Sequence, residues 1–208
     1  EDSSIFNKEI PTKMPKFKVG FVLLAPPIIL SLLALIGWVL DISLLTRGFV
    51  SDVSMNPATA VCFILLSLEV IRLIAGNNVP FISRAGKLAT CVVIVASAMK
   101  LSDLMFGTSF AIDAQLFSAK LAANLAQANR MAPNTAICFM TLGLSILFLR
   151  GRSNTSIPTA QALALIPLFI AIVAIAGHLY EIKLFYGVGN FIGMAFNTAV
   201  SFIFLSGT

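Results

Sequence analysis

Hydroxyl, amide and thiol side chains recur at helical spacing within apolar stretches of this sequence, and they are its best candidates for chemistry. Met55, Thr59, Cys62 and Leu66 lie at i, i+4, i+7 and i+11, which places them on one face of a helix. The same stripe returns as Met131, Thr135, Cys138 and Leu142, and again as Met194, Thr198, Ser201 and Leu205.

Two interpretations of this stripe stay open. Small and hydroxyl-bearing residues let membrane helices pack closely and hydrogen-bond across their interface, so the stripe would be a packing seam. Alternatively, the three copies line a pseudo-threefold pocket that binds a small molecule or a lipid. The pocket residues would be Thr59, Thr135, Thr198, Asn134 and Asn197, and further ligand-binding candidates are Cys62, Cys138 and His178.

His178 is the only histidine of the chain. With a methionine partner it would suit the axial ligation of a b-type haem. Its counterpart in the repeat described below is Trp38, at the same depth near the end of a span, where amphipathic rings are enriched. Metal sites usually need several ligands, and none cluster in this sequence. We therefore expect an interfacial histidine and no cofactor.

Four charged residues fall within or near the apolar stretches. Glu69 and Arg72 are three residues apart, so they can pair on one helix, and Glu69 continues the threonine stripe toward the interior. Lys100 and Asp103 repeat this spacing, which predicts a second pair. Intramembrane charges are candidates for function because they are costly to bury, although charges near helix ends cost less.

The sequence contains no HExxH, P-loop or GxGxxG motif and no nucleophile–base pair. We therefore expect no enzymatic activity from this chain.

The composition indicates a membrane protein. Hydrophobic residues make up 58% of the chain and charged residues 11%, with a mean hydropathy of +0.96, whereas soluble domains carry about 25% charge. A water-soluble fold of this length could not bury so much apolar surface, so lipid must be the partner. The net charge of +5 is scattered at the ends of apolar runs, which suits lipid headgroups and does not suggest nucleic-acid binding.

Six apolar segments are candidates for transmembrane helices, which predicts an all-α integral membrane bundle. They are Val19–Leu40, Pro57–Ala75, Leu88–Met105, Pro133–Leu149, Pro158–Tyr180 and a segment that starts near Met194. Residues 1–18 precede them as a polar N-terminal segment.

The chain contains three degenerate copies of one helical hairpin, at about residues 19–76, 87–150 and 158–208. Each copy has an outward helix, a loop and an inward helix that begins near the methionine of the stripe. An offset of 140 aligns Pro27 with Pro167, and it also aligns Gly37 with Gly177, Trp38 with His178 and Asp41 with Glu181. The middle copy has Asp103 at the last of these positions. It carries an insertion, Phe110–Asn129, whose second half reads as a short amphipathic helix.

Lysine and arginine are more numerous on the side that holds the N-terminus and the loops near Asn77 and Ser153. The positive-inside rule therefore predicts a cytoplasmic N-terminus in a multi-pass protein. The last segment, Met194–Thr208, is about 22 Å long as a helix, which is short for a bilayer. From this we expect the natural chain to continue past Thr208 into the cytoplasm.

Three runs carry a resemblance to a known family: Met131-Ala-Pro-Asn-Thr-Ala-Ile-Cys-Phe-Met-Thr-Leu-Gly-Leu, Ala111-Ile-Asp-Ala-Gln-Leu-Phe117, and Gly177-His-Leu-Tyr-Glu-Ile with Leu184-Phe-Tyr-Gly187. From about Val19 to its end the chain resembles the MASE-like multi-helix membrane sensor modules. These modules stand in front of PAS, histidine-kinase and GGDEF domains in bacterial signalling proteins.

The resemblance implies a sensory input domain in the bacterial inner membrane, as a homodimer, which passes a helix movement to a cytoplasmic kinase or cyclase. Prolines at 27 and 167 would supply bendable points, because each removes a backbone hydrogen bond. Two alternatives remain. A transporter or channel often has repeats around a midplane site, and a structural subunit of a larger membrane complex would show the same apolar helices.

Overall fold

The computed structural model describes residues 16–48, 53–76, 79–108, 110, 112–117, 130–151, 155–186 and 193–208. Every regular element within these ranges is a helix, which confirms the all-α prediction. Two predictions fall outside them. One is the polar N-terminal segment, apart from the start of the first helix at Lys16, and the other is the amphipathic helix expected in the second half of Phe110–Asn129.

The long helices are α1 (Lys16–Leu40), α3 (Pro57–Ile74), α4 (Pro80–Phe106), α7 (Pro133–Arg150) and α8 (Ser156–Leu179). The shorter ones are α2 (Ser43–Arg47), α5 (Ile112–Gln115), α9 (Lys183–Tyr186) and α10 (Phe196–Ser206). The five long helices are apolar enough to cross a membrane, which confirms five of the six predicted spans. The sixth, α10, is apolar but has 11 residues, about 17 Å at 1.5 Å per residue.

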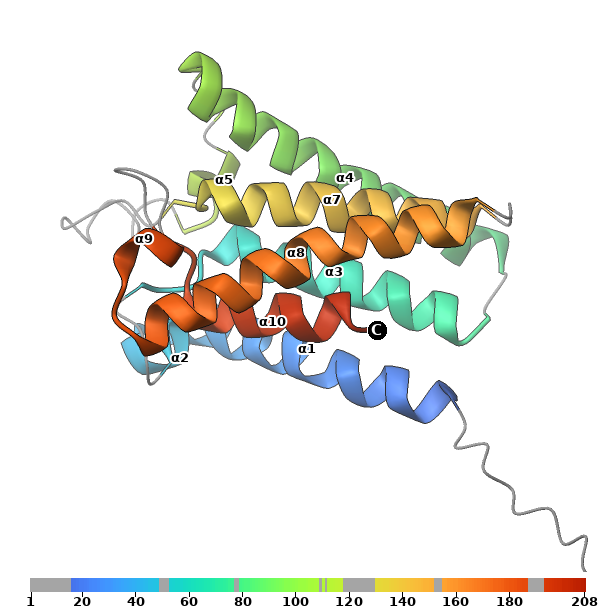
Figure 1. Ribbon diagram of the computed structural model, residues 1–208, viewed down its shortest axis with the longest axis horizontal. Helices are drawn as coiled ribbons and strands as arrows, with labels where there is room; N and C mark the ends of the chain where they lie inside the picture. Colours follow the sequence, from blue (N-terminus) through green and yellow to red (C-terminus); the bar gives the residue numbers. More distant parts are fainter. Residues whose placement is uncertain are drawn as a thin grey trace, which may run out of the picture.

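The helices form a closed ring. In space α1 packs on α3, α3 on α4, α4 on α7, α7 on α8, α8 on α10, and α10 again on α1 (Figure 1). The inner members α3, α7 and α10 also touch one another, whereas α1, α4 and α8 stand outside them. Accordingly, 56% of the most apolar 18-residue stretch is buried in α3 and in α7, whereas the buried share is 22–28% in the outer helices.

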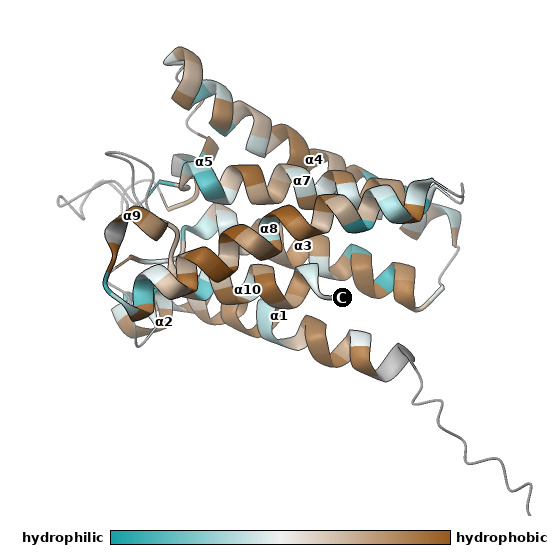
Figure 2. Cartoon of the chain, in the orientation of Figure 1, coloured by the Kyte–Doolittle hydropathy of each residue, from teal (hydrophilic) through white to brown (hydrophobic). Residues whose placement is uncertain are grey.

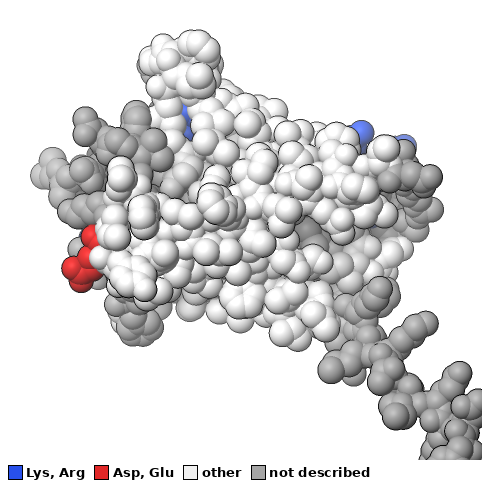
Figure 3. Space-filling view, viewed as in Figure 1, with Lys and Arg blue, Asp and Glu red and all other residues white. Residues whose placement is uncertain are grey.

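The outer helices present apolar side chains to the surroundings. Val22 of α1, Leu88 of α4 and Phe169 of α8 are each about two-thirds exposed, and most residues of α1 and α8 are hydrophobic (Figure 2). In the face seen in Figure 3, the charged side chains among the described residues lie toward the two ends of the bundle. An apolar belt between charged ends is the arrangement that a bilayer requires.

The inner helices begin in the same way in all three copies. The residues before them, Asn56, Ala132 and Ala195, are extended, with φ of −65°, −67° and −64° and ψ of 140°, 149° and 148°. Proline follows in the first two copies, at a position where its missing N–H has no helical partner. Asn56 adds a side-chain cap, because its Oδ1 accepts a hydrogen bond from the Ala58 N–H at 2.8 Å.

Two of the outer helices also end alike. Asp41 follows the end of α1 and Glu181 follows the end of α8, and their φ values of 57° and 56° are left-handed. In each case the next residue bonds back five positions, from the Ile42 N–H to the Gly37 carbonyl (2.9 Å) and from the Ile182 N–H to the Gly177 carbonyl (2.8 Å). This is the Schellman ending of a helix.

The middle copy departs from this pattern. α4 continues past Asp103 to Phe106, and its end leans away from the bundle (Figure 1). The turn that follows α1 requires a residue without a side chain at position 37. A Cβ at Gly37 would lie 2.8 Å from the Leu45 Cβ and 3.0 Å from the Ile42 carbonyl oxygen. The middle copy has Met99 at this position, so its chain cannot fold back over the helix end in the same tight turn.

The start of α4 also differs from the prediction. Hydropathy placed it near Leu88, but the helix begins at Pro80. Residues 80–87 include Ser83, Arg84 and Lys87, which lower the hydropathy without interrupting the helix. The prolines at 27 and 167 lie buried inside α1 and α8, which remain continuous through them.

We expect Gly37→Ala to lower the free energy of unfolding by about 1–3 kcal/mol, because the new methyl group overlaps α2 and the backbone of Ile42. Gly20→Ala in the same helix is the matched control. Its closest contact is the Ile74 Cδ1, the mobile end of a side chain. The change from glycine to alanine raises the helix propensity equally in both variants. Unfolding measurements in detergent should therefore show that Gly37→Ala is the less stable of the two. Equal stability would contradict this account of the turn.

Candidate functional site

The structure brings the three stripe threonines together. Thr59, Thr135 and Thr198 come from α3, α7 and α10, and each is 2% exposed. They line one small cavity where the inner helices begin, and the rest of its lining consists of Ser54, Asn56, Arg130, Met131, Ala132, Gly193 and Ala195. Its volume is about 10 Å³, which is room for roughly one water molecule. In this conformation the cavity can therefore hold a ligand about as large as one water molecule.

The two asparagines predicted for this pocket do not line it. Asn134 is buried, and its Oδ1 accepts a hydrogen bond from the Thr135 N–H at 3.0 Å. Asn197 is also buried and packs against Gly48, where a Cβ would lie 2.5 Å from the Asn197 Oδ1. The reason is geometric, since each asparagine precedes a cavity threonine and so points about 100° away around the helix. Asn56 and Arg130 line the cavity instead.

One turn beyond the threonines, three phenylalanines fill the centre of the bundle. Phe63, Phe139 and Phe202 are fully buried, and their ring centroids are 4.6–4.8 Å apart. These tilted and edge-to-face contacts are favourable for aromatic rings. Cys62 and Cys138 belong to the surrounding hydrophobic core as free thiols. The stripe is therefore a packing seam along most of its length, with a polar cavity at one end.

Three repeat-related side chains tie the outer helices to the starts of the inner helices. In the first copy the Trp38 Nε1 donates to the Met55 carbonyl at 2.9 Å. In the third copy the His178 Nε2 lies 2.8 Å from the Met194 carbonyl. The ring nitrogen that a haem iron would use is thus engaged with the backbone, and His178 performs the same anchoring task as Trp38.

Lys100 occupies this position in the middle copy, but it acts through a third residue. Its Nζ donates to the Asp113 Oδ2 at 2.8 Å, and the same oxygen accepts the Met131 N–H at 2.7 Å. Both ionic side chains are buried, at 6% and 2% exposure. Asp113 also joins the first copy, because its carbonyl accepts from the Asn56 Nδ2 at 3.1 Å.

The predicted Lys100–Asp103 pair is therefore corrected to Lys100–Asp113. Asp103 instead closes the end of α4, where its Oδ1 accepts hydrogen bonds from the Thr108 hydroxyl at 2.8 Å and the Phe110 N–H at 2.9 Å. The spacing misled because a pair three residues apart competes with distant partners: Lys100 bonds to Asp113 and Asp103 bonds to the residues that follow α4.

Asp113 lies outside the spans, and two opposing effects act on its carboxyl. Burial raises its pKa, but hydrogen bonds and charge from Lys100, the Met131 N–H and Arg130 lower it more, so the pKa stands below its ordinary value. Asp113 is thus held as a carboxylate between a lysine and a backbone N–H.

A second buried ionic cluster lies at the opposite end of the inner helices. Glu69 and Arg72 pair as their spacing predicts, with the Arg72 Nη2 2.7 Å from the Glu69 Oε1. Glu69 is 2% exposed, as expected of a residue that faces the interior. Arg150 of α7 also bonds this carboxylate, and its Nη2 donates to the Ser83 carbonyl of α4 at 2.7 Å.

Gly86 makes this cluster sterically feasible. A Cβ on Gly86 would lie 1.7 Å from the Glu69 Oε2, so α4 can approach α3 only where it has no side chain. The cluster therefore joins α3, α4 and α7. The sequence contains no signal for the Arg150 contact, which spans 81 residues, because an arginine at the end of an apolar segment indicates only topology.

Comparison of the chain with protein-family models, with curated proteins and with solved structures finds no match. Its function is therefore proposed from its residues and their geometry.

Gly86→Ala should destabilise the protein because the new methyl group takes the place of the Glu69 carboxylate. In a Glu69→Ala background that overlap is gone, so the double variant should be more stable than the sum of the two single effects. We expect a coupling of about 0.5–3 kcal/mol from unfolding measurements on all four proteins. Gly86→Ala combined with Glu181→Ala, an exposed carboxylate at the other end, is the control and should be additive. Additivity of the Glu69 and Gly86 effects would refute the contact.

Asp113→Asn should cost about 3–5 kcal/mol at neutral pH, because it leaves the buried Lys100 without its carboxylate. Since folding lowers the pKa of Asp113, its contribution is fully present above the unfolded value of about 3.9 and is lost as pH falls through the folded value. The stability gap between wild type and variant should therefore be constant from about pH 5 to 8 and narrow below about pH 4. Asp103→Asn, which keeps its acceptor oxygen, should have a small effect. A gap that persists unchanged at low pH would count against this assignment.

Proposed function

We propose that this chain is the sensory input domain of a bacterial signalling protein of the histidine kinase or diguanylate cyclase type. It would lie in the inner membrane with a cytoplasmic N-terminus and act as a homodimer. In this view the end of the bundle with α2, α5 and α9 faces outward. A stimulus there shifts the inner helices, and α10 carries the shift to the output domain that the resemblance implies.

The observation that carries this proposal is the closed centre of the bundle. The rings of Phe63, Phe139 and Phe202 touch one another around the axis. A channel or transporter needs a route through the protein and usually places its substrate site near the middle of the membrane. Here aromatic rings fill the centre of the bundle one turn beyond the threonine cavity, which favours transmission of a helix movement over passage of a solute.

The distribution of buried charge supports the same interpretation. Asp113 and Lys100 lie where the inner helices α3, α7 and α10 begin, and Glu69 with its two arginines lies at the other end of α3. The first cluster joins the first and second repeats, and the second cluster joins α3 to α4 and α7. Packed elements that are tied at both ends move as units, which is how small displacements at one site reach another.

The test uses the intact protein in proteoliposomes, with its kinase or cyclase turnover as the readout. Phe139→Ala removes one of the three central rings, so it should change the output by about fivefold or more, the scale of ordinary coupling energies. The matched control is Ile137→Ala, which lies on the same helix but is 37% exposed on its outer side. It should leave the output unchanged.

Three results would overturn the proposal. The first is an intact protein with no nucleotide-dependent signalling activity, and the second is an output that Phe139→Ala and Ile137→Ala affect equally. The third is evidence for one of the two alternatives: solute flux above that of protein-free liposomes for a transporter, or stoichiometric co-purification with other chains for a structural subunit.

A further inference from the structure

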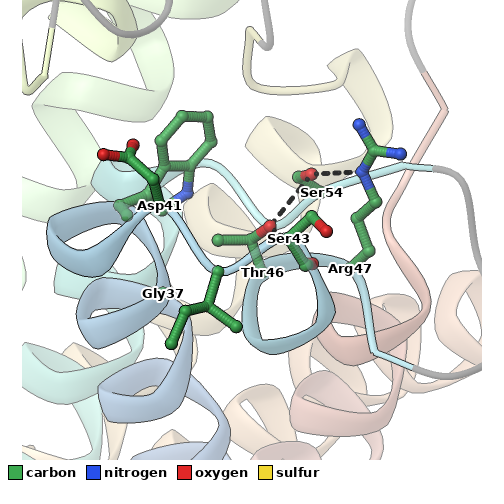
Figure 4. A pocket seen from close by; sticks show the side chains of 8 residues that line it. Gly37, Asp41, Ser43, Thr46, Arg47 and Ser54 are labelled. Carbon is green, nitrogen blue, oxygen red and sulfur yellow. Dashed lines mark hydrogen bonds between the residues drawn. The ribbon is translucent and has the colours of Figure 1, made fainter.

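A polar pocket lies beside the end of α1, outside the cluster of threonines. It is bounded by Trp38, Asp41, Ser43, Thr46, Arg47 and Ser54 (Figure 4). Its volume is about 140 Å³, well below the roughly 300–1,000 Å³ of sites for drug-sized ligands. The pocket therefore suits a headgroup or a small metabolite.

Opposite charges stand on the two sides of this pocket. Figure 4 shows Asp41 on one side and Arg47 on the other, with the hydroxyl-bearing side chains of Ser43, Thr46 and Ser54 between them. The Arg47 Nε donates to the Ser54 Oγ at 3.2 Å. Within the described part of the chain, the structure gives the two terminal nitrogens of Arg47 no further hydrogen bond. A zwitterionic ligand would complement this arrangement, with its anionic group toward Arg47 and its cationic group toward Asp41.

The setting of the pocket favours a lipid over a soluble ligand. Leu40 at the end of α1 is 60% exposed, and Ile42 and Leu44 beside it are 41% and 50% exposed. α1 is an apolar, outward-facing span that ends at this point, so the pocket lies at the depth of the lipid headgroups. A phospholipid is the ligand that brings both a charged headgroup and apolar chains to such a place.

We propose that this pocket binds the headgroup of a zwitterionic phospholipid with a primary ammonium, a phosphoethanolamine lipid. The phosphate accepts hydrogen bonds from the Arg47 guanidinium and the neighbouring hydroxyls, and the ammonium donates to the Asp41 carboxylate. The acyl chains run along the exposed side chains of Leu40 and Leu44. Because a quaternary ammonium has no N–H to donate, phosphocholine lipids bind less tightly.

The repeat provides an internal comparison. Glu181 of the third copy corresponds to Asp41 and also ends its helix at a left-handed φ. The position that corresponds to Arg47 at the same offset is Gly187, so this copy lacks the anion-binding side chain. The proposed site is specific to the first copy, and Glu181 is a matched carboxylate outside it.

The pocket is bonded to the start of an inner helix. The Thr46 hydroxyl donates to the Ser54 Oγ at 3.2 Å, and the Met55 N–H donates to the Thr46 carbonyl at 2.8 Å. Met55 also accepts from Trp38. A bound lipid would thus act on α3 through its first residues, but lipid binding itself does not depend on the signalling role.

The test exploits Trp38, the single tryptophan of the chain, which borders the pocket. Phosphatidylethanolamine is titrated into protein in detergent micelles while the Trp38 fluorescence is recorded, and native mass spectrometry counts the bound lipids. We expect a saturable fluorescence change with one tightly bound lipid, and a weaker response to phosphatidylcholine. Asp41→Asn should raise the half-maximal concentration about tenfold, the effect of losing one charge-assisted hydrogen bond. Asparagine tolerates the left-handed backbone at this position, so the helix end is preserved.

Glu181→Gln is the control and should bind as the wild type does, and thermal unfolding should be alike for all three proteins. Equal responses to phosphatidylethanolamine and phosphatidylcholine, or equal binding by Asp41→Asn and wild type, would overturn the proposal. Soluble O-phosphoethanolamine forms the other arm of the experiment. If it matches the lipid at equal concentration, the site takes a soluble zwitterion and the lipid assignment is wrong.

Discussion

The start of each inner helix sets the main constraint on this fold. Met55, Met131 and Met194 stand just before the extended residues that start these helices, and they are at most 5% exposed. Neither water nor the helix that follows can satisfy all of their peptide groups, and an unsatisfied peptide group inside a membrane protein costs several kcal/mol. A side chain from another element supplies the missing hydrogen bond in each copy: Trp38 at the Met55 carbonyl, His178 at the Met194 carbonyl, and Asp113 at the Met131 N–H.

This constraint explains why three chemically different residues occupy one position of the repeat. An indole and an imidazole each reach a carbonyl directly, and an ammonium reaches the backbone through a carboxylate. What the position requires is a polar tip on a long side chain that is otherwise surrounded by protein. A single histidine in an apolar chain suggests a cofactor ligand, but here its place among Trp38 and Lys100 gives it a structural explanation.

Much of the architecture can be predicted from the sequence, because it depends on periodicity. The apolar spans follow from length and hydropathy, and the inward direction of Thr59 and Glu69 follows from helical spacing. The pairings at Asp113 and Arg150 cannot be predicted in this way, since they join residues far apart in the chain. Asn134 shows a finer limit, because a neighbour of a cavity residue points elsewhere on the same helix. The predicted partner of Lys100 was wrong, and the error falls in the middle copy, which has no glycine at the position that shapes the turn after α1.

The contact between α10 and α1 closes the ring of helices, and this closure has a consequence for assembly. Each hairpin offers one surface to the hairpin after it and a different surface to the one before it, which is a heterologous interface. Such an interface either grows without end or closes at a fixed number of units, and here it closes at three. The three hairpins of this chain are thus the single-chain counterpart of a cyclic trimer. Joining the units in one polypeptide fixes the number of units at three and allows the sequence of one unit to differ from the others. Arg47 is an example, because the third copy has a glycine at the corresponding position.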